Sequence, residues 1–278
     1  LLTQKLRKMS TQKFATKALH TGHDVSKNGG TRAVPIYQTT SYVFDNADDA
    51  AGRFNLSVPG FIYTRLNNPT NDILEQRLAD LEGGIGAVAT ASGTAAISTT
   101  LLTLLRAGDH IVASSSLYGG TYNLLSVTLP RHGITTTFVD PSDPENFQKA
   151  AQENTRAFFV ESLGNPKLDV LDLEAISKEA KAHKVPLIVD NTVATPYLLN
   201  PIEYGANIVI HSLTKYINGN GTSLGGIIID AGTFDWTNGK FPEFTEPSPG
   251  YHGLVYSEAL GAAAFIAKIR VEGLRDTE

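Results

Sequence analysis

The segment IVIHSLTKYINGNGTSLGGIIID, residues 208–230, places a single lysine, Lys215, in a polar turn between two apolar runs. The hydroxyl residues Ser212 and Thr214 precede the lysine, and glycines follow it. The lysine has three interpretations: an ordinary surface residue, a point charge that binds phosphate, or a nucleophile whose amine forms a Schiff base. The strand-like runs on both sides favour the two functional interpretations of this amine over that of an ordinary surface lysine.

The composition is that of a globular protein of 278 residues, 41% hydrophobic and 18% charged, long enough for one large domain with appendages. No cysteine is present, which excludes disulfides, thiolate metal sites and a cysteine nucleophile. The net charge is −5 and the basic residues are scattered, so we expect neither nucleic acid nor a membrane as partner. The N-terminal segment lacks the apolar core of a secretory signal, so we expect a cytoplasmic protein. Met9, the single methionine, is the expected natural start.

From residue 70 onward, apolar strand-like runs alternate with amphipathic helix-like segments. The predicted strands are 85–93, 110–114, 135–140, 156–162, 186–191, 207–212 and 225–230. The predicted helices include 68–83, 94–109 and 171–184. Strands that are apolar on both faces and separated by helices indicate an α/β fold, with a mostly parallel sheet covered by helices on both faces. Ligands of such sheets bind at the carboxyl ends of the strands.

The chain divides into three parts by its patterning. Residues 1–60 lack regular periodicity and are predicted to form an N-terminal arm. Residues 61–258 are predicted to form the large domain, which ends in a long ordered loop over 231–257 that is rich in Pro, Gly and aromatic residues. Residues 259–278 are predicted to begin a helix that links to a C-terminal small domain absent from this chain.

Two further groups fall at the ends of predicted strands. Asp190 closes the strand 186–191 and has four interpretations: a metal ligand, a base, the partner of a protonated ring nitrogen, or a simple helix cap. We expect no metal site, because His183 and His211 have no ligand spacing with this carboxylate. The segment ASGTAA, residues 91–96, places small residues before a helix, where backbone N–H groups bind phosphate.

A lysine, an aspartate and a phosphate turn together fit one ligand, pyridoxal 5′-phosphate. The amine of Lys215 would react with the aldehyde, and Asp190 would keep the ring nitrogen protonated so that the ring accepts electrons. The turn and the hydroxyl groups would hold the phosphate. Tyr118, at a predicted strand-to-helix turn, is either the aromatic ring that covers the cofactor or an ordinary packed side chain.

Six segments in order resemble the cysteine/methionine-metabolism group of fold-type-I pyridoxal-phosphate enzymes, and the similarity runs from about residue 16 to the end of the chain. They are YTRLNNPTNDILEQRLADLEGG (63–84), ASGTAAI (91–97), SLYGGTYNLL (116–125), ESLGNPKLDV (161–170), IVDNTVATP (188–196) and HSLTKYINGNGTSLGG (211–226). The resemblance implies the large domain of a fold-type-I transferase.

The resemblance also implies roles for individual residues. Lys215 would be the Schiff-base lysine and proton shuttle, and Asp190 would pair with the pyridinium nitrogen. Tyr118 would stack on the ring, and Asn165 would lie beside its phenolic oxygen. The remaining cofactor-binding residues that it implies are Gly93, Thr94, Ser212 and Thr214 on the phosphate, with Tyr63 and Arg65 reaching the phosphate of a neighbouring subunit. The active unit would be at least a homodimer, and usually a homotetramer of two such dimers.

Within this group, the segment FDWTNGKFPEFTEPSPGYHGLVY (234–256) resembles the O-acetylhomoserine sulfhydrylases of methionine biosynthesis, which convert O-acetylhomoserine and sulfide to homocysteine and acetate. The alternatives are cystathionine γ-synthase and methionine γ-lyase. The lyases carry a cysteine in the turn after the stacking tyrosine, where this chain has Gly120.

Two departures from the family are visible. Position 94 is threonine where many relatives have methionine or histidine. The C-terminal domain that supplies an arginine for the substrate carboxylate has no counterpart here, since neither Arg270 nor Arg275 matches that motif. A further alternative is therefore a form that binds cofactor without turnover.

Overall fold

A computed structural model describes residues 12–277. The expected start at Met9 and the first part of the predicted arm lie outside these residues. The strands are β1 (Gly86–Thr90), β2 (His110–Ser114), β3 (Thr135–Val139), β4 (Thr155–Glu161), β5 (Leu187–Asp190), β6 (Ile208–Ser212) and β7 (Gly226–Asp230). The α-helices are α1 (Phe14–His20), α2 (Ala47–Phe54), α3 (Pro69–Glu82), α4 (Gly93–Leu104), α5 (Gly119–Asn123), α6 (Glu145–Ala150), α7 (Leu173–Ala182), α8 (Thr195–Leu198), α9 (Pro242–Thr245), α10 (Tyr256–Leu260), α11 (Ala264–Lys268) and α12 (Arg275–Thr277).

The seven strands form one sheet in the order β1-β7-β6-β5-β4-β2-β3. All neighbouring pairs are parallel except those of β7, which runs antiparallel to both β1 and β6. Each strand coincides with one of the seven predicted apolar runs, and the predicted mostly parallel sheet is confirmed. The carboxyl ends of β4, β5 and β6 consequently meet at one edge.

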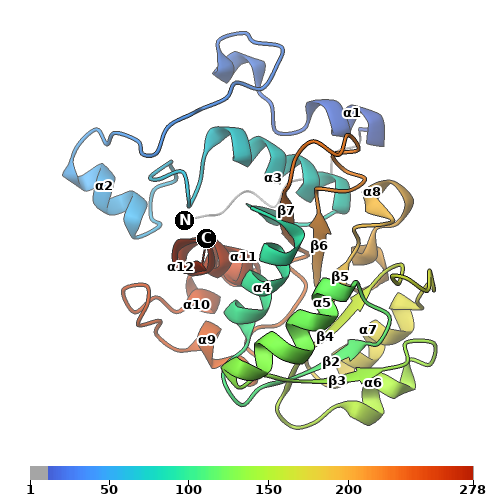
Figure 1. Cartoon of the computed structure of the whole chain (residues 1–278). Helices are drawn as coiled ribbons and strands as arrows, with labels where there is room; N and C mark the ends of the chain where they lie inside the picture. The colour runs from blue at the N-terminus through green and yellow to red at the C-terminus, as the bar shows by residue number, and fades with distance from the viewer. Residues whose placement is uncertain (1–11, 278) are drawn as a thin grey trace.

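Helices cover both faces of the sheet, because the strands are apolar on both sides. On one face, buried residues of the sheet pack with α4, α11 and the aromatic residues Trp236 and Phe244 of the segment after β7. On the other face, they pack with α3, α6 and α7. In Figure 1 the segment that carries α1 and α2, drawn in blue, runs along the outside of the molecule, away from the strands.

Helix α3 begins and ends where its sequence predicts. The Asn68 side chain accepts a hydrogen bond from Thr70 N at 2.8 Å, and Pro69 occupies the first helical position. Gly83 ends the helix with a φ of 82°, a left-handed conformation that glycine adopts without steric cost. The helix therefore stops beside the carboxyl ends of the central strands.

The C-terminal segment differs from the continuous helix that the sequence predicts. Gly261 has a φ of 54° and separates α10 from a turn that leads into α11. After α11 the chain widens into a π-helix over Ile269–Leu274 before α12. The spacing of apolar residues predicts which face of this segment is buried, but it does not predict the positive φ of Gly261, which interrupts the helical hydrogen bonds. Among residues 12–277, no helix has the length and apolar character needed to cross a lipid bilayer.

Ile228 tests the packing of the antiparallel strand, since its side chain is fully buried in the core shared with α4. The substitution Ile228→Ala is expected to lower the free energy of unfolding by about 2–5 kcal/mol, because it leaves a cavity. Urea unfolding measures the change. Val170→Ala, at a side chain that is 77% exposed, is the control and should cost less than about 0.5 kcal/mol. Equal losses in both variants would contradict the central position of β7.

Candidate functional site

The site lies where the amino end of α4 meets the carboxyl ends of β5 and β6. The main chain of Gly93 is so close to Ser212 that a Cβ atom on Gly93 would lie 2.6 Å from the Ser212 Cβ. Gly226, at the start of β7, approaches in the same way, and a side chain there would overlap the carbonyl oxygen of Ser92. Only glycine permits these approaches. The sequence-predicted residues Gly93 and Ser212 are thus in direct contact.

This contact creates a place for an anion. Ser92 caps α4, with its Oγ accepting from Ala95 N at 3.0 Å. The first N–H groups of an α-helix, here those of Gly93 and Thr94, have no partner within the helix. They and the Ser212 hydroxyl meet at the positive end of a 12-residue helix. The local chemistry is that of a phosphate site.

Asp190 ends β5 at the same edge. Its Oδ1 accepts hydrogen bonds from Thr192 N at 2.9 Å and from the Thr192 hydroxyl. Burial raises the pKa of the Asp190 carboxyl, and the Thr192 hydrogen bonds and the charges of His211 and Lys215 partly oppose this rise. A cation placed against this carboxylate would be strongly favoured, as a protonated ring nitrogen would be.

Lys215 lies in the turn after β6, with its N–H donating to Ser212 O at 3.3 Å. Its side chain is exposed in the single chain, so the amine is accessible to a ligand. Its ammonium nevertheless lies near enough to lower the pKa of Asp190. Thr214, one position earlier, exchanges hydrogen bonds with the main chain of Gly225 at 3.2 and 3.3 Å, which closes the turn that carries the lysine.

Glu161 is a residue of this site that sequence reasoning missed. It ends β4 directly opposite Asp190, and its carboxylate accepts the backbone N–H of Tyr118 at 2.7 Å and that of Asn165. Burial, followed by the neighbouring charge of Asp190, raises the pKa of Glu161 to about 8. The sequence contained a sign of this role, because a glutamate at the end of an apolar strand needs hydrogen-bond donors at that edge of the sheet.

The backbone N–H groups of Tyr118 and Asn165, which lie in two separate loops, therefore share the Glu161 carboxylate as their acceptor. The Tyr118 ring is 51% exposed and lies over the turn at Gly120, where a Cβ would meet the ring edge at 2.5 Å. Any larger residue at position 120 would displace the ring. Asn165 is exposed and precedes a cis peptide bond to Pro166.

Tyr63 and Arg65 lie apart from this group. They line a cavity of about 800 Å³, bounded also by the ends of β1 and by the turn before β7, including Leu213 and Leu224. The Arg65 guanidinium lies 5.4 Å from the centre of the Tyr63 ring. Neither Lys215 nor Asp190 lines this cavity.

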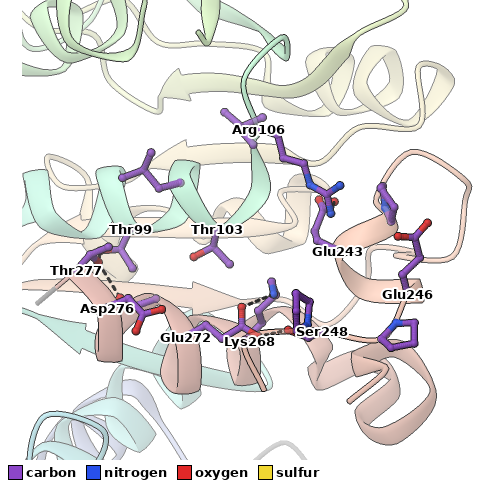
Figure 2. A pocket seen from close by; sticks show the side chains of 17 residues that line it. Thr99, Thr103, Arg106, Glu243, Glu246, Ser248, Lys268, Glu272, Asp276 and Thr277 are labelled. Carbon is purple, nitrogen blue, oxygen red and sulfur yellow. Dashed lines mark hydrogen bonds and ion pairs between the residues drawn. The ribbon is translucent and has the colours of Figure 1, made fainter. Parts of the chain in front are cut away.

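A second cavity, of about 360 Å³, lies between α4 and the C-terminal segment (Figure 2). Several of its charged groups are paired: Glu272 accepts from Ser248 Oγ, Tyr256 OH and Lys268 Nζ at 2.6–2.7 Å, and Arg106 lies 3.3 Å from Glu243. None of the sequence-predicted site residues lines it. Within residues 12–277, no three side chains of the metal-binding types are grouped to hold a metal ion.

The residues at the strand ends fit pyridoxal phosphate. The glycine at position 93 lets the α4 amides lie directly beside the Ser212 hydroxyl, so that one phosphate can accept from both. Asp190 supplies a half-buried carboxylate, Lys215 an accessible amine and Tyr118 an exposed aromatic face. These are the four groups that this cofactor requires.

Comparison with known proteins agrees with this fit. Residues 15–261 match the model of the family described as Cys/Met metabolism PLP-dependent enzyme. The chain is 59% identical over 269 residues to the O-acetyl-L-homoserine sulfhydrylase of Leptospira meyeri, covering 94% of this chain and 61% of that protein. It is 51% identical over 271 residues to the homocysteine synthase of Schizosaccharomyces pombe, covering 96% and 63%. The chain thus spans about three fifths of the length of these curated relatives.

A solved structure shows the same fold with the cofactor in place. It is named as an O-acetylhomoserine (thiol)-lyase of Campylobacter jejuni and holds N′-pyridoxyl-lysine-5′-monophosphate. The TM-score is 0.84 at 40% sequence identity, over 95% of this chain and 70% of that one. By family match, sequence identity and fold, the chain belongs to the pyridoxal-phosphate-dependent enzymes of cysteine and methionine metabolism.

Proposed function

We propose that this protein replaces the acetoxy group of O-acetylhomoserine by sulfide, giving homocysteine and acetate. The observation that carries the proposal is the 59% identity to the Leptospira meyeri O-acetyl-L-homoserine sulfhydrylase, which extends over 94% of this chain. The cofactor, when bound, would draw electrons from the substrate carbon skeleton so that the proton on the α carbon, and then one on the β carbon, becomes acidic.

The residues of the chain then bind, orient and move protons. Lys215 Nζ would hold the cofactor and, once freed by the substrate amine, would take the proton from the α carbon and pass it on before taking one from the β carbon. After acetate leaves and sulfide adds, it would return protons to the carbon skeleton. Asp190 would keep a positive charge on the ring nitrogen, and Tyr118 would cover the ring. Asn165 would hold the ring oxygen and orient the incoming amino acid.

The phosphate is held from two sides. The N–H groups of Gly93 and Thr94 and the hydroxyl groups of Ser212 and Thr214 hold it from the same chain. Tyr63 and Arg65 line a separate cavity, which supports their role in a neighbouring subunit. The active unit is accordingly at least a homodimer, with a homotetramer as the proposed assembly.

The proposed organisation keeps an arm over residues 1–60, a cofactor-binding domain over 61–258 and a C-terminal segment over 259–278, which short helices form in place of the single predicted helix. The exposed arm, with its short helices α1 and α2, supports the first boundary. The cytoplasmic location remains a prediction.

Homocysteine formation from O-acetylhomoserine and sulfide, with pyridoxal phosphate present, tests the reaction. Lys215→Ala is expected to lower the rate by on the order of 10³-fold or more and to remove the visible absorption of the lysine-linked cofactor. Wild-type protein that turns over cysteine instead of sulfide would favour the cystathionine γ-synthase alternative. Cofactor absorption without turnover of either acceptor would favour a chain that binds cofactor only.

The shared site predicts complementation between subunits. Arg65→Ala should lower activity by on the order of tenfold, because one charge-assisted contact to phosphate is lost. Co-expression of Lys215→Ala with Arg65→Ala chains should restore activity above both parents, since one site of each mixed dimer then has both residues. Lys215→Ala co-expressed with the double variant cannot rebuild an intact site and is the control. A mixture no more active than its parents would argue that each chain has its own complete site.

Glu161 predicts a pH dependence of stability. The folded chain keeps the Glu161 proton up to about pH 8, whereas the unfolded chain releases it near the ordinary glutamate pKa. The wild type should therefore lose unfolding free energy as pH rises through this window, at most about 1.4 kcal/mol per pH unit. Glu161→Gln has no proton to lose, so its stability relative to wild type should grow from pH 5 to pH 8 in urea unfolding without cofactor. A difference that does not vary with pH would refute this account of Glu161.

A further inference from the structure

The three strands that end at the site place alternate side chains on opposite faces of the sheet. In β5, Ile188 belongs to the core on the α4 side and Val189 to the core on the α3 side. In β6, Ile210 and Val209 divide in the same way. Asp190 and Ser212 therefore face the site, while their chain neighbours Asn191 and His211 lie behind the sheet. Glu161 and Ser162 of β4 repeat the pattern.

The residues behind the sheet form one buried hydrogen-bonded group around Glu82, the last residue of α3. Glu82 Oε1 lies 2.7 Å from His211 Nε2 and accepts from Asn191 Nδ2 at 3.1 Å. Glu82 Oε2 accepts from Asn200 Nδ2 at 3.1 Å. Ser162 Oγ donates to Asn191 Oδ1 at 2.7 Å, which extends the group to β4. The side chains of Glu82, Asn191 and His211 are fully inaccessible to solvent.

Position 82 is unfavourable for a carboxylate unless neighbouring groups donate hydrogen bonds to it. It is fully buried and lies at the C-terminal end of a helix, where the helix dipole disfavours negative charge. His211 Nδ1 has no partner among residues 12–277, so Glu82 alone fixes the imidazole within the described structure. One carboxylate consequently joins the last positions of β5 and β6.

We propose that Glu82 is a positioning residue for the cofactor site. By holding Asn191 and His211 behind the sheet, it sets the separation and direction of Asp190 and Ser212 in front of it. This positioning role rests on one part of the proposed function, which is that Asp190 and Ser212 hold the cofactor. Glu82 touches neither cofactor nor substrate, and it acts through the two strand ends.

A double-mutant cycle on pyridoxal-phosphate affinity tests the proposal without any substrate. Glu82→Gln is expected to weaken cofactor binding by about tenfold in the wild-type background. In the Asp190→Asn background the same change should weaken it by less than about twofold, because the group it positions is already impaired. The loss of stability from Glu82→Gln, measured by urea unfolding, should be equal in both backgrounds.

Glu75→Gln is the matched control. Glu75 is a buried carboxylate of the same helix, paired with Arg270 and accepting from Ala89 N of β1 at 2.9 Å, whereas the bonds of Glu82 go to the ends of β5 and β6. It should lower stability and change cofactor affinity by less than about twofold. If Glu82→Gln does not fold, His211→Gln, which removes the other half of the pair, is put through the same cycle.

Equal weakening of cofactor binding by Glu82→Gln in both backgrounds would overturn the proposal, as would an effect no larger than that of Glu75→Gln. A protein that binds pyridoxal phosphate but does not convert O-acetylhomoserine would overturn the proposed reaction and leave this cycle interpretable. The two failures are therefore distinguishable.

Discussion

The close approach of α4 to the strand ends is the constraint on which the site depends. Gly93 touches Ser212, and Gly226 lies against the main chain of Ser92, so that the amino end of the helix is held against β6 and β7. Without this approach, the helix amides and the Ser212 hydroxyl would not share one anion site. The sheet order then brings Asp190 to the next position, because β5 is the parallel neighbour of β6.

The elements of the fold were predictable from sequence because each has a local cause. Two-sided apolar runs predicted the strands, and Asn68 with Gly83 predicted both ends of α3. The strand-end rule brought Asp190, Ser212 and Gly93 to one edge. Their roles toward a cofactor followed from combining these groups with Lys215, the family resemblance added those of Asn165, Tyr63 and Arg65, and all of these roles remain proposals.

What the sequence did not predict depends on contacts between distant segments or on the backbone. The acceptor role of Glu161 requires the loop of Tyr118, and Glu82 becomes informative only beside Asn191 and His211. The break at Gly261 comes from one left-handed residue within an otherwise helical pattern.

The antiparallel strand has a consequence for biosynthesis. Within the described structure β1 is an edge strand that pairs with β7 alone, although almost the whole domain separates them in sequence. A chain emerging from the ribosome can pair β4, β5 and β6 as they appear, but β1 has no partner until Asp230 has been made. Closing so long a loop is entropically costly and slow. The α4 amides face a complete set of strand ends only after β7 has paired with β1 and β6, so the nascent chain acquires its anion site after that step.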